Sequence, residues 1–147
     1  MKRLHLHLSV PDLEQGIKFY STLFASKPSK VKSDYAKWQL DDPRVNFAIS
    51  TRGDAIGLDH LGIQAEADAD VIETQQRLKA ASFPTSDIDS GVCCYAESNR
   101  FWAVDPAGIP WENFVTMKDA EVYGVDKQSR DSACGDTAAT ADSASCC

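Results

Sequence analysis

The segment 91–116 contains two adjacent cysteines and, further on, Glu112, which could do chemistry together. Cys93 and Cys94 place two soft sulfur ligands side by side. Glu112 lies in an aromatic, apolar run, where burying an unpaired carboxylate would be costly. A bound metal ion would offset that cost. The segment therefore suggests a metal centre next to a pair of thiols.

The three histidines of the chain, His5, His7 and His60, could complete such a centre. Two histidines with one carboxylate form the ligand set that non-heme Fe(II) favours, because three protein ligands leave coordination positions open for a substrate and O₂. The alternatives are ordinary ones: a lone histidine in a strand is usually structural, and a glutamate near a strand end usually lies at the surface.

The elements that would position these residues occur twice along the chain. Residues 4–10 alternate strictly between apolar and polar side chains, which predicts a strand with His5 and His7 on the face opposite the leucines. Asp12 followed by Gln15 resembles a capping box and predicts a helix to about Leu23. Three short strands are expected near 27–32, 35–40 and 45–50. The second half repeats this order, with a strand at 59–65, a helix that Asp68 caps and that runs to about 81, and strands near 85–88, 92–96, 101–104 and 111–116.

The two halves also match in residue types. His5–Val10 aligns with His60–Ala65, and Pro43–Phe47 aligns with Pro110–Phe114. His5 is thereby paired with His60, whereas His7 aligns with Gly62 and Val45 with Glu112. A repeat on this scale predicts two modules that close around a shared cleft. We therefore expect His5, His60 and Glu112 to be the metal ligands.

Composition limits the class of protein. A chain of 147 residues that is 43% apolar can form one buried domain or two half-domains with a common core. A net charge of −7 and a pI near 4.8 argue against nucleic acid or an anionic membrane as partner. No apolar run approaches the ~20 residues of a membrane span, and the start of the chain lacks a signal-peptide core. We expect a cytoplasmic protein whose five cysteines are free thiols or metal ligands.

The expected domain covers residues 1–117, with one module at about 2–50 and the other at about 57–116. Residues 118–147 are rich in small and polar side chains and are predicted to be a disordered tail. The tail carries Cys134, Cys146 and Cys147, which could scavenge soft metals or be incidental thiols.

Several of these motifs together resemble the vicinal oxygen chelate superfamily, which includes glyoxalase I, fosfomycin resistance enzymes and extradiol dioxygenases. The motifs are the pattern from His5 to Tyr20, His60 in the second half, and Asp105-Pro-x-Gly-x-x-Trp-Glu112. Cys93-Cys94-Tyr95-Ala96 ahead of a Phe-Trp pair resembles its ArsI/CadI branch of organoarsenical carbon–arsenic lyases and cadmium-induced proteins.

The resemblance implies an α+β fold of paired βαβββ modules and Fe(II) held by His5, His60 and Glu112, with other divalent metals possible. It also implies O₂-dependent cleavage of the carbon–arsenic bond in trivalent organoarsenicals such as methylarsonous acid. Cys93 and Cys94 would bind the substrate. Trivalent arsenic with one carbon substituent has two positions left for thiolates, so two thiols match its valence. No catalytic residue beyond the metal ligands is expected.

Neighbouring residues in a regular strand point to opposite faces of the sheet, which limits how the two thiols can act together. Cys93 and Cys94 can hold one atom only if residues 91–95 form a bulge or loop. Arg100, the nearest cation, is interpreted as a solvated surface residue. Trp102 and Trp111 are expected in the core, with the substrate pocket as the alternative.

Two other functions remain open. One is another enzyme of the superfamily, such as a glutathione-dependent lyase or transferase. Val45 at the position of a fourth ligand counts against glyoxalase I itself, unless a second subunit supplies one, and the chain could be a monomer or a homodimer. The other is a thiol-based protein that sequesters cadmium or arsenite without turnover. Whether His7 can substitute for His5 stays open.

Overall fold

The computed structural model describes residues 1–93 and 95–121, without the side chain of Cys93. The elements in chain order are β1 (Arg3–Ser9), α1 (Leu13–Leu23), β2 (Lys30–Lys32), β3 (Tyr35–Asp41), β4 (Arg44–Ser50), β5 (Gly57–Ala65), α2 (Asp68–Ala80), β6 (Asp89–Cys93), β7 (Ala96–Val104) and β8 (Pro110–Asp119). The order is strand, helix and three strands, twice over, as the sequence repeat predicts.

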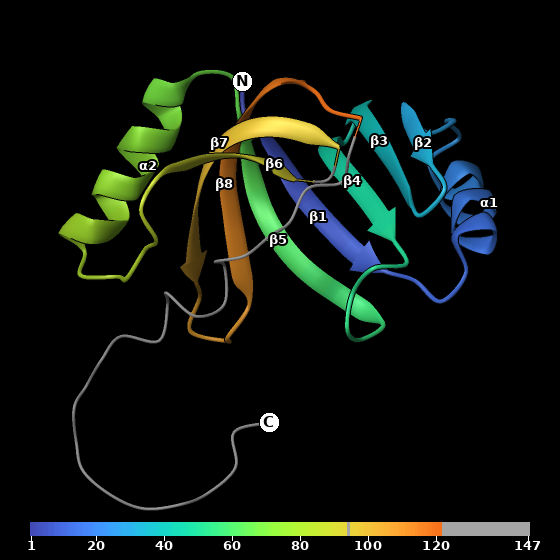
Figure 1. Ribbon diagram of the computed structural model, residues 1–147, viewed down its shortest axis with the longest axis horizontal. Coiled ribbons are helices and arrows are strands. Elements are labelled where there is room, and N and C mark those ends of the chain that lie inside the picture. The colour runs from blue at the N-terminus through green and yellow to red at the C-terminus, as the bar shows by residue number, and fades with distance from the viewer. Residues whose placement is uncertain (94, 122–147) are drawn as a thin grey trace, which may run out of the picture.

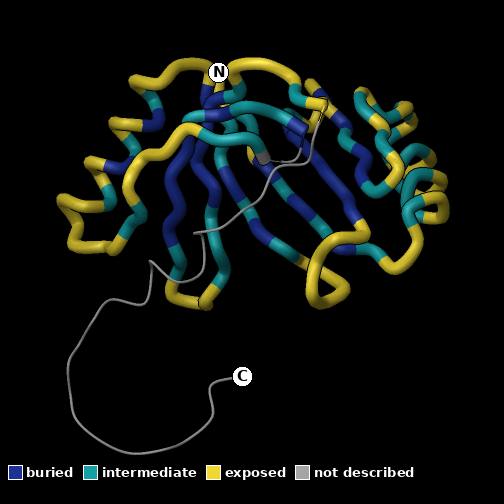
Figure 2. Tube along the Cα trace, in the orientation of Figure 1, coloured by how far each residue is buried: buried dark blue, intermediate teal, exposed yellow. Residues whose placement is uncertain are grey.

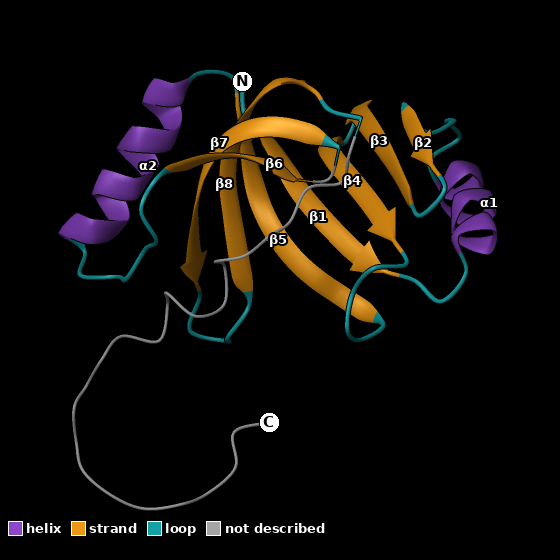
Figure 3. Cartoon of the chain, viewed as in Figure 1, coloured by secondary structure: helices purple, strands orange, loops and turns teal. Residues whose placement is uncertain are grey.

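All eight of these strands form one curled sheet in the order β2-β3-β4-β1-β5-β8-β7-β6 (Figures 1 and 3). The first strand of each module lies at the centre, where β1 pairs antiparallel with β5. Each of these two strands pairs parallel with the last strand of its own module, β1 with β4 and β5 with β8. The fold is therefore a pair of βαβββ modules joined along β1 and β5, and α1 and α2 lie at the two ends of the sheet (Figure 1).

The alternation in β1 decides which side chains enter which layer. Leu6 and Leu8 point toward α1 and pack against its core, whereas His5, His7 and Ser9 are buried on the opposite face. The core beneath α1 is rich in aromatic residues and contains Trp38, Phe47, Tyr20 and Phe24. The core beneath α2 is built from smaller residues, including Ala65, Val71 and Ala103. Figure 2 shows the buried positions concentrated along the central strands.

The two helices begin as the sequence suggests, with one difference at the capping residue. Asp12 caps α1, and its carboxylate accepts a hydrogen bond from the Gln15 backbone N–H at 3.0 Å. The prediction that Asp68 caps α2 is wrong. The N-cap is Ala67, which has no side chain to bond, and Asp68 is the first helical residue, where its charge still favours the helix dipole.

The second module contains one strand fewer in its middle than the sequence pattern suggests. Residues 85–88 form no strand, only an isolated bridge between Thr85 and Ala103. The strands predicted at 92–96 and 101–104 are instead a hairpin whose arms are β6 and the longer β7. Pro84 and the polar residues that follow it do not supply a continuous pairing edge.

In the part of the chain that the structure describes, no helix is both long and apolar enough to cross a bilayer.

Candidate metal centre

The sheet brings residues that are far apart in sequence to one point on its inner face. β1 contributes His5 and His7, β5 contributes His60, and β8 contributes Glu112. These four side chains are almost completely buried; His5, His60 and Glu112 are each 4% exposed. The pairing of β5 with β8 places Glu112 opposite Gly62, two residues from His60 and therefore on the same face.

The ligand atoms of His5, His60 and Glu112 lie at distances that suit a metal ion. The two histidine Nε2 atoms are 3.1 Å apart, and Nε2 of His60 is 3.6 Å from Oε2 of Glu112. Metal–nitrogen bonds of about 2.1 Å at right angles would place two donors about 3 Å apart. Both distances from Nε2 of His60 therefore match donors at adjacent corners of a coordination sphere.

The hydrogen bonds of the two imidazoles set which nitrogen carries the proton. Nδ1 of His5 lies 3.0 Å from the carbonyl oxygen of Asn46, and Nδ1 of His60 lies 2.7 Å from the carboxylate of Asp59. Both partners can only accept, so both Nδ1 atoms donate. The two Nε2 lone pairs then face each other, which is unfavourable unless a cation lies between them. Such outer hydrogen bonds are typical of metal-binding histidines, and the site fits a metal ion on this ground.

Electrostatics keeps these groups in the protonation states that a metal needs. Burial, followed by repulsion from His60, lowers the pKa of His5 from 6.5 to about 3, so its imidazole is neutral at pH 7. Burial alone would raise the pKa of Glu112. The neighbouring imidazole of His60 opposes this effect most strongly, and the pKa of Glu112 stays below its usual value. A neutral imidazole next to an ionised carboxylate is a ready donor set for a divalent cation.

The third histidine lies in the same cluster. The ligand atoms of His5, His7 and His60 all fall within 4.8 Å of one another, so the three histidines could hold a metal ion. Nε2 of His7, however, already lies 2.9 Å from the hydroxyl of Ser50. His5 presents its Nε2 toward His60 instead, which is the geometric reason to prefer it over His7.

A small cavity lined by residues of both modules adjoins the cluster. It has a volume of about 30 Å³, room for about one water molecule, and its lining includes His5, Glu112, Asn46 and Tyr35. The side-chain oxygen of Asn46 is buried and has no hydrogen-bond partner among the described residues. The inner face therefore has a polar space next to the ligand atoms.

Arg100 differs from the sequence interpretation, which placed it at the solvated surface. It is 4% exposed, and its Nη1 lies 3.6 Å from Oε1 of Glu112. Its Nε lies 3.8 Å from the carboxylate of Asp89. Arg100 and Glu112 share the inner face because Arg100 pairs with Phe114, two residues along β8 from the glutamate. The alternation of side chains along β7 places Arg100 on the inner face. The polar residues around it in the sequence, however, give no reason to expect its burial.

The two strand tryptophans have different surroundings. Trp102 is buried on the inner face, with its ring centroid 5.2 Å from that of His60. It therefore lines the candidate centre, which was the alternative interpretation from sequence. Trp111 points to the outer face, where its indole N–H donates to Asp105 at 3.0 Å.

The proposed substrate thiols are only partly described. Cys94 and the side chain of Cys93 lie outside the described residues, so the predicted pair cannot be placed. Tyr95, which follows directly, adopts a left-handed conformation at φ 60° and is 6% exposed. Its hydroxyl donates to Asp34 at 2.5 Å, and its carbonyl accepts from the Lys30 ammonium at 2.9 Å. These contacts join the β6–β7 hairpin of the second module to the first module.

Comparison with known proteins identifies the family. A model of the Glyoxalase/Bleomycin resistance protein/Dioxygenase superfamily matches residues 2–112, which include every element from β1 to the start of β8. The chain belongs to this superfamily. The superfamily fold also appears in homoprotocatechuate 2,3-dioxygenase from Brevibacterium fuscum, with a TM-score of 0.60 and 18% identity over 82% of this chain and 38% of that one.

Two relatives within the superfamily cover nearly the whole chain. A protein of Thermomonospora curvata named trivalent organoarsenical cleaving enzyme is 37% identical over 100% of both chains. The cadmium-induced protein CadI of Mycobacterium bovis is 32% identical over 97% of this chain and 94% of its own length. The resemblance to this branch of the superfamily, suggested by the Cys-Cys-Tyr-Ala motif, is confirmed.

The register of this superfamily fold corrects one alignment made from the sequence. If His5 is equivalent to His60, then His7 is equivalent to Gly62; β4 pairs Ala48 with His7, and β8 pairs Glu112 with Gly62. The counterpart of Glu112 is therefore Ala48, not Val45. Val45 points into the core beneath α1, on the other side of the sheet. The first module still offers no fourth metal ligand, because an alanine side chain cannot bind a metal.

Proposed function

We propose that this protein is a metal-dependent enzyme that cleaves the carbon–arsenic bond of trivalent organoarsenicals, using Fe(II) and O₂. The observation that carries the proposal is the convergence of two histidine side chains and a glutamate carboxylate at one buried point. The named activity of the T. curvata relative supplies the substrate class. The dioxygenase fold of the B. fuscum neighbour is consistent with O₂ as the co-substrate.

His5, His60 and Glu112 would hold the ion, while Asn46 and Asp59 fix the orientation of the two imidazoles. When bound, Fe(II) would bind and activate O₂. The burial of all three ligands excludes bulk water from this point. The small polar cavity, with room for about one water molecule, and the ring of Trp102 adjoin this point.

Cys93 and Cys94 are proposed to bind the substrate through arsenic. An arsenical with one carbon substituent can exchange both hydroxyls for two thiolates, with loss of two water molecules, and most of the rate gain would come from this positioning. The overall reaction balances without a further reductant. Methylarsonous acid and O₂ give arsenous acid and formaldehyde, so arsenic stays trivalent while the carbon is oxidised and O₂ is reduced.

The test is a turnover assay with defined metal and gas. Purified full-length protein is loaded with Fe(II) without air, mixed with methylarsonous acid, and then exposed to O₂, and the arsenic species are separated and quantified. Conversion to arsenite only when both Fe(II) and O₂ are present supports the proposal. Absence of arsenite under all conditions, or equal conversion without Fe(II), would reject it.

A second candidate is suggested by the CadI relative: a protein that binds cadmium or arsenite through thiols without turnover. In that case the five cysteines would matter more than the histidines. Truncation after Asp119, the last residue of β8, separates the two functions. Turnover should survive the truncation if the protein is an enzyme, whereas metal capture should weaken if the tail cysteines bind. A need for glutathione in the assay would instead indicate a glutathione-dependent lyase or transferase.

The proposal also covers the extent of the catalytic unit and the location of the protein in the cell. The catalytic unit would be the predicted domain of residues 1–117 with its two modules, extended to the end of β8 at Asp119, and the residues after β8 would be an accessory tail. The protein would act in the cytoplasm, where the thiols stay reduced.

A further inference from the structure

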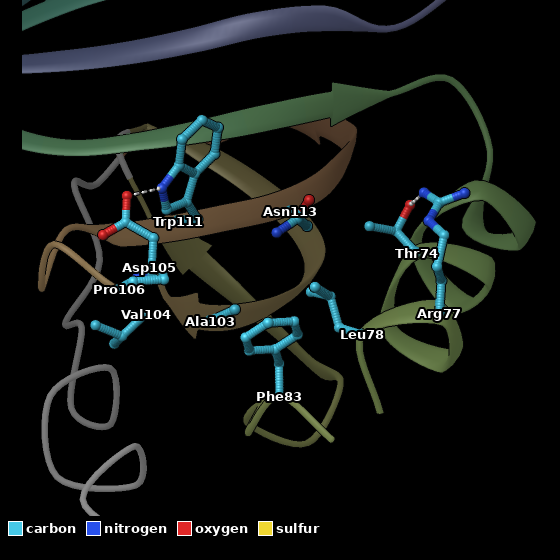
Figure 4. Close-up of a pocket in the computed structure, with 10 residues that line it drawn as sticks. All are labelled: Thr74, Arg77, Leu78, Phe83, Ala103, Val104, Asp105, Pro106, Trp111 and Asn113. Atoms are coloured by element: carbon cyan, nitrogen blue, oxygen red, sulfur yellow. Dashed lines mark hydrogen bonds between the residues drawn. The ribbon is translucent and has the colours of Figure 1, made fainter. Parts of the chain in front are cut away.

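A second pocket lies on the outer face of the sheet, away from the candidate metal centre. It is enclosed by α2, the segment after it and strands β7 and β8, and its volume is about 360 Å³. Figure 4 shows Phe83 and Leu78 on one side, Trp111 and Asp105 at one end and Arg77 at the other. An engineered apolar cavity of about 150 Å³ is already large enough to bind benzene. The pocket therefore has room for a substituted aromatic ring.

The pocket exists because the second module lacks the large side chains that fill the same space in the first. In the first module, Tyr20 and Phe24 of α1 pack there against Phe47. Helix α2 begins 55 residues after α1, the same offset that separates His60 from His5, so Gln75 and Lys79 take the places of these two aromatic residues. The space stays hollow because neither Gln75 nor Lys79 fills it, although Leu78 of α2 lines one side.

One wall of the pocket is polar where the first module is apolar. Asn113 is the counterpart of Ile49, because Ile49 pairs with Leu8 in β1 and Asn113 pairs with the equivalent Ile63 in β5. Ile49 is fully buried in the core beneath α1. Asn113 is only 6% exposed, and its amide forms no hydrogen bond with any residue that the structure describes. An amide that lines a pocket without a protein partner can bond to a ligand that both donates and accepts.

The charges at the two ends of the pocket favour an uncharged ligand. The carboxylate of Asp105 accepts hydrogen bonds from Trp111 and from the backbone N–H groups of Ala107 and Ile109, so it is satisfied and remains ionised. At the other end the guanidinium of Arg77 lies 3.4 Å from Glu73. Neither end offers an uncompensated charge, and the lining between them is mostly apolar.

The geometry points to a binding site for small neutral aromatic compounds that carry one hydroxyl group, with phenol as the simplest example. The ring would lie between Phe83 and Trp111, and the hydroxyl would bond to the amide of Asn113. The inference does not depend on the metal chemistry proposed for the inner face, since the pocket shares no residue with that site. It does share a strand with it, because Trp111 and Asn113 flank Glu112 in β8.

The test is a titration of the ¹⁵N-labelled full-length chain with phenol, followed by NMR. Saturable shifts of the Trp111 indole N–H and the Asn113 side-chain amide are expected. Asn113→Ile copies the residue of the first module, and it should weaken binding by at least about tenfold. Phe83→Ala removes one wall, and because Phe83 is 48% exposed this variant keeps the core intact. It should weaken binding as well.

Phe19→Ala is the matched control, because Phe19 is exposed and lines another apolar depression, on the outer surface of α1. It should leave the phenol affinity unchanged. The inference is overturned if the Trp111 signal does not saturate, or if the Phe83→Ala protein binds phenol as wild type does. It is also overturned if the shifts centre on Phe19 and disappear in its variant.

Discussion

Replacing Gly62 with alanine is expected to displace the strand that carries Glu112. A Cβ at this position would lie 2.2 Å from the carbonyl oxygen of Glu112 and 3.4 Å from the Cβ of His5. The first contact is too short to persist, and the clashing atom belongs to the backbone, so no side-chain rotation can relieve it. We therefore expect β5 and β8 to separate by about 1 Å at this point.

The magnitude follows from that displacement. Overpacking a well-packed region costs about 1–3 kcal/mol, which sets the expected loss in the free energy of unfolding. A misplacement of about 1 Å in a catalytic group can lower the rate by about 100-fold. Because Glu112 moves relative to His60, we expect weaker Fe(II) binding and a loss of turnover much larger than the loss of stability alone would cause.

The assay compares Gly62→Ala with Gly16→Ala, a matched control on the other side of the sheet. In Gly16→Ala the new Cβ would lie 2.8 Å from Cδ1 of Ile49, the end of a side chain that can turn away. Stability is measured by chemical unfolding and Fe(II) affinity by anaerobic titration. Only Gly62→Ala should lose metal affinity. If it binds Fe(II) and turns over substrate as wild type does, the position of Glu112 does not matter and our reasoning is wrong.

His5→Gln should abolish Fe(II) binding in the same titration, whereas His7→Gln should retain it, since Nε2 of His7 is bonded to a serine hydroxyl; equal losses would make His7 a ligand. Asp59→Asn removes the carboxylate that orients His60 and should weaken Fe(II) binding about 10- to 100-fold, and an unchanged affinity would contradict this outer hydrogen bond. Tyr95→Phe should change the pH dependence of stability, measured by chemical unfolding. The hydrogen bond to a carboxylate, followed by burial, raises the pKa of Tyr95 above 10. The folded state therefore keeps a proton that the unfolded state loses, so wild-type stability falls as pH rises above 10. The phenylalanine variant should lack this alkaline decline, and an identical profile would remove Tyr95 as its source.

The central strands were predictable because their pattern is strong. Leucines alternate with histidines in β1, so the sequence alone places His5 and His7 on one face and the leucines on the other. The match between His5 and His60 then indicates that two modules share a cleft. Both inferences rest on local periodicity, which survives folding when one face of a strand is buried.

The register between strands could not be read in the same way. A shift in alignment by an odd number of residues, such as the three from Val45 to Ala48, moves a residue to the other face of the sheet. That is how Val45 was paired with Glu112 from sequence, although the ladder makes Ala48 its counterpart. Only the pairing of β4 with β1 fixes this, and no single-strand pattern contains it.

Contacts between charged or polar groups that are distant in the sequence were equally hard to predict. The burial of Arg100 depends on Glu112, an acid on the neighbouring strand, and nothing in the surrounding polar sequence indicates that contact. The same is true of the hydrogen bond between Tyr95 and Asp34, which lie 61 positions apart in the sequence and in different modules. Asn113 lies between Trp111 and Val115 on the outer face of β8, and its polar side chain becomes meaningful only once Ile49 is known to be its counterpart.

The central claim is that His5, His60 and Glu112 bind one Fe(II) ion that is needed to break a carbon–arsenic bond. The most direct measurement is arsenic speciation after wild-type, His60→Gln and Glu112→Gln proteins are each loaded with Fe(II), given methylarsonous acid and exposed to O₂. We expect stoichiometric arsenite from the wild type and none from either variant, with the variants still folded by circular dichroism. Arsenite production by both variants at the wild-type rate would contradict the claim.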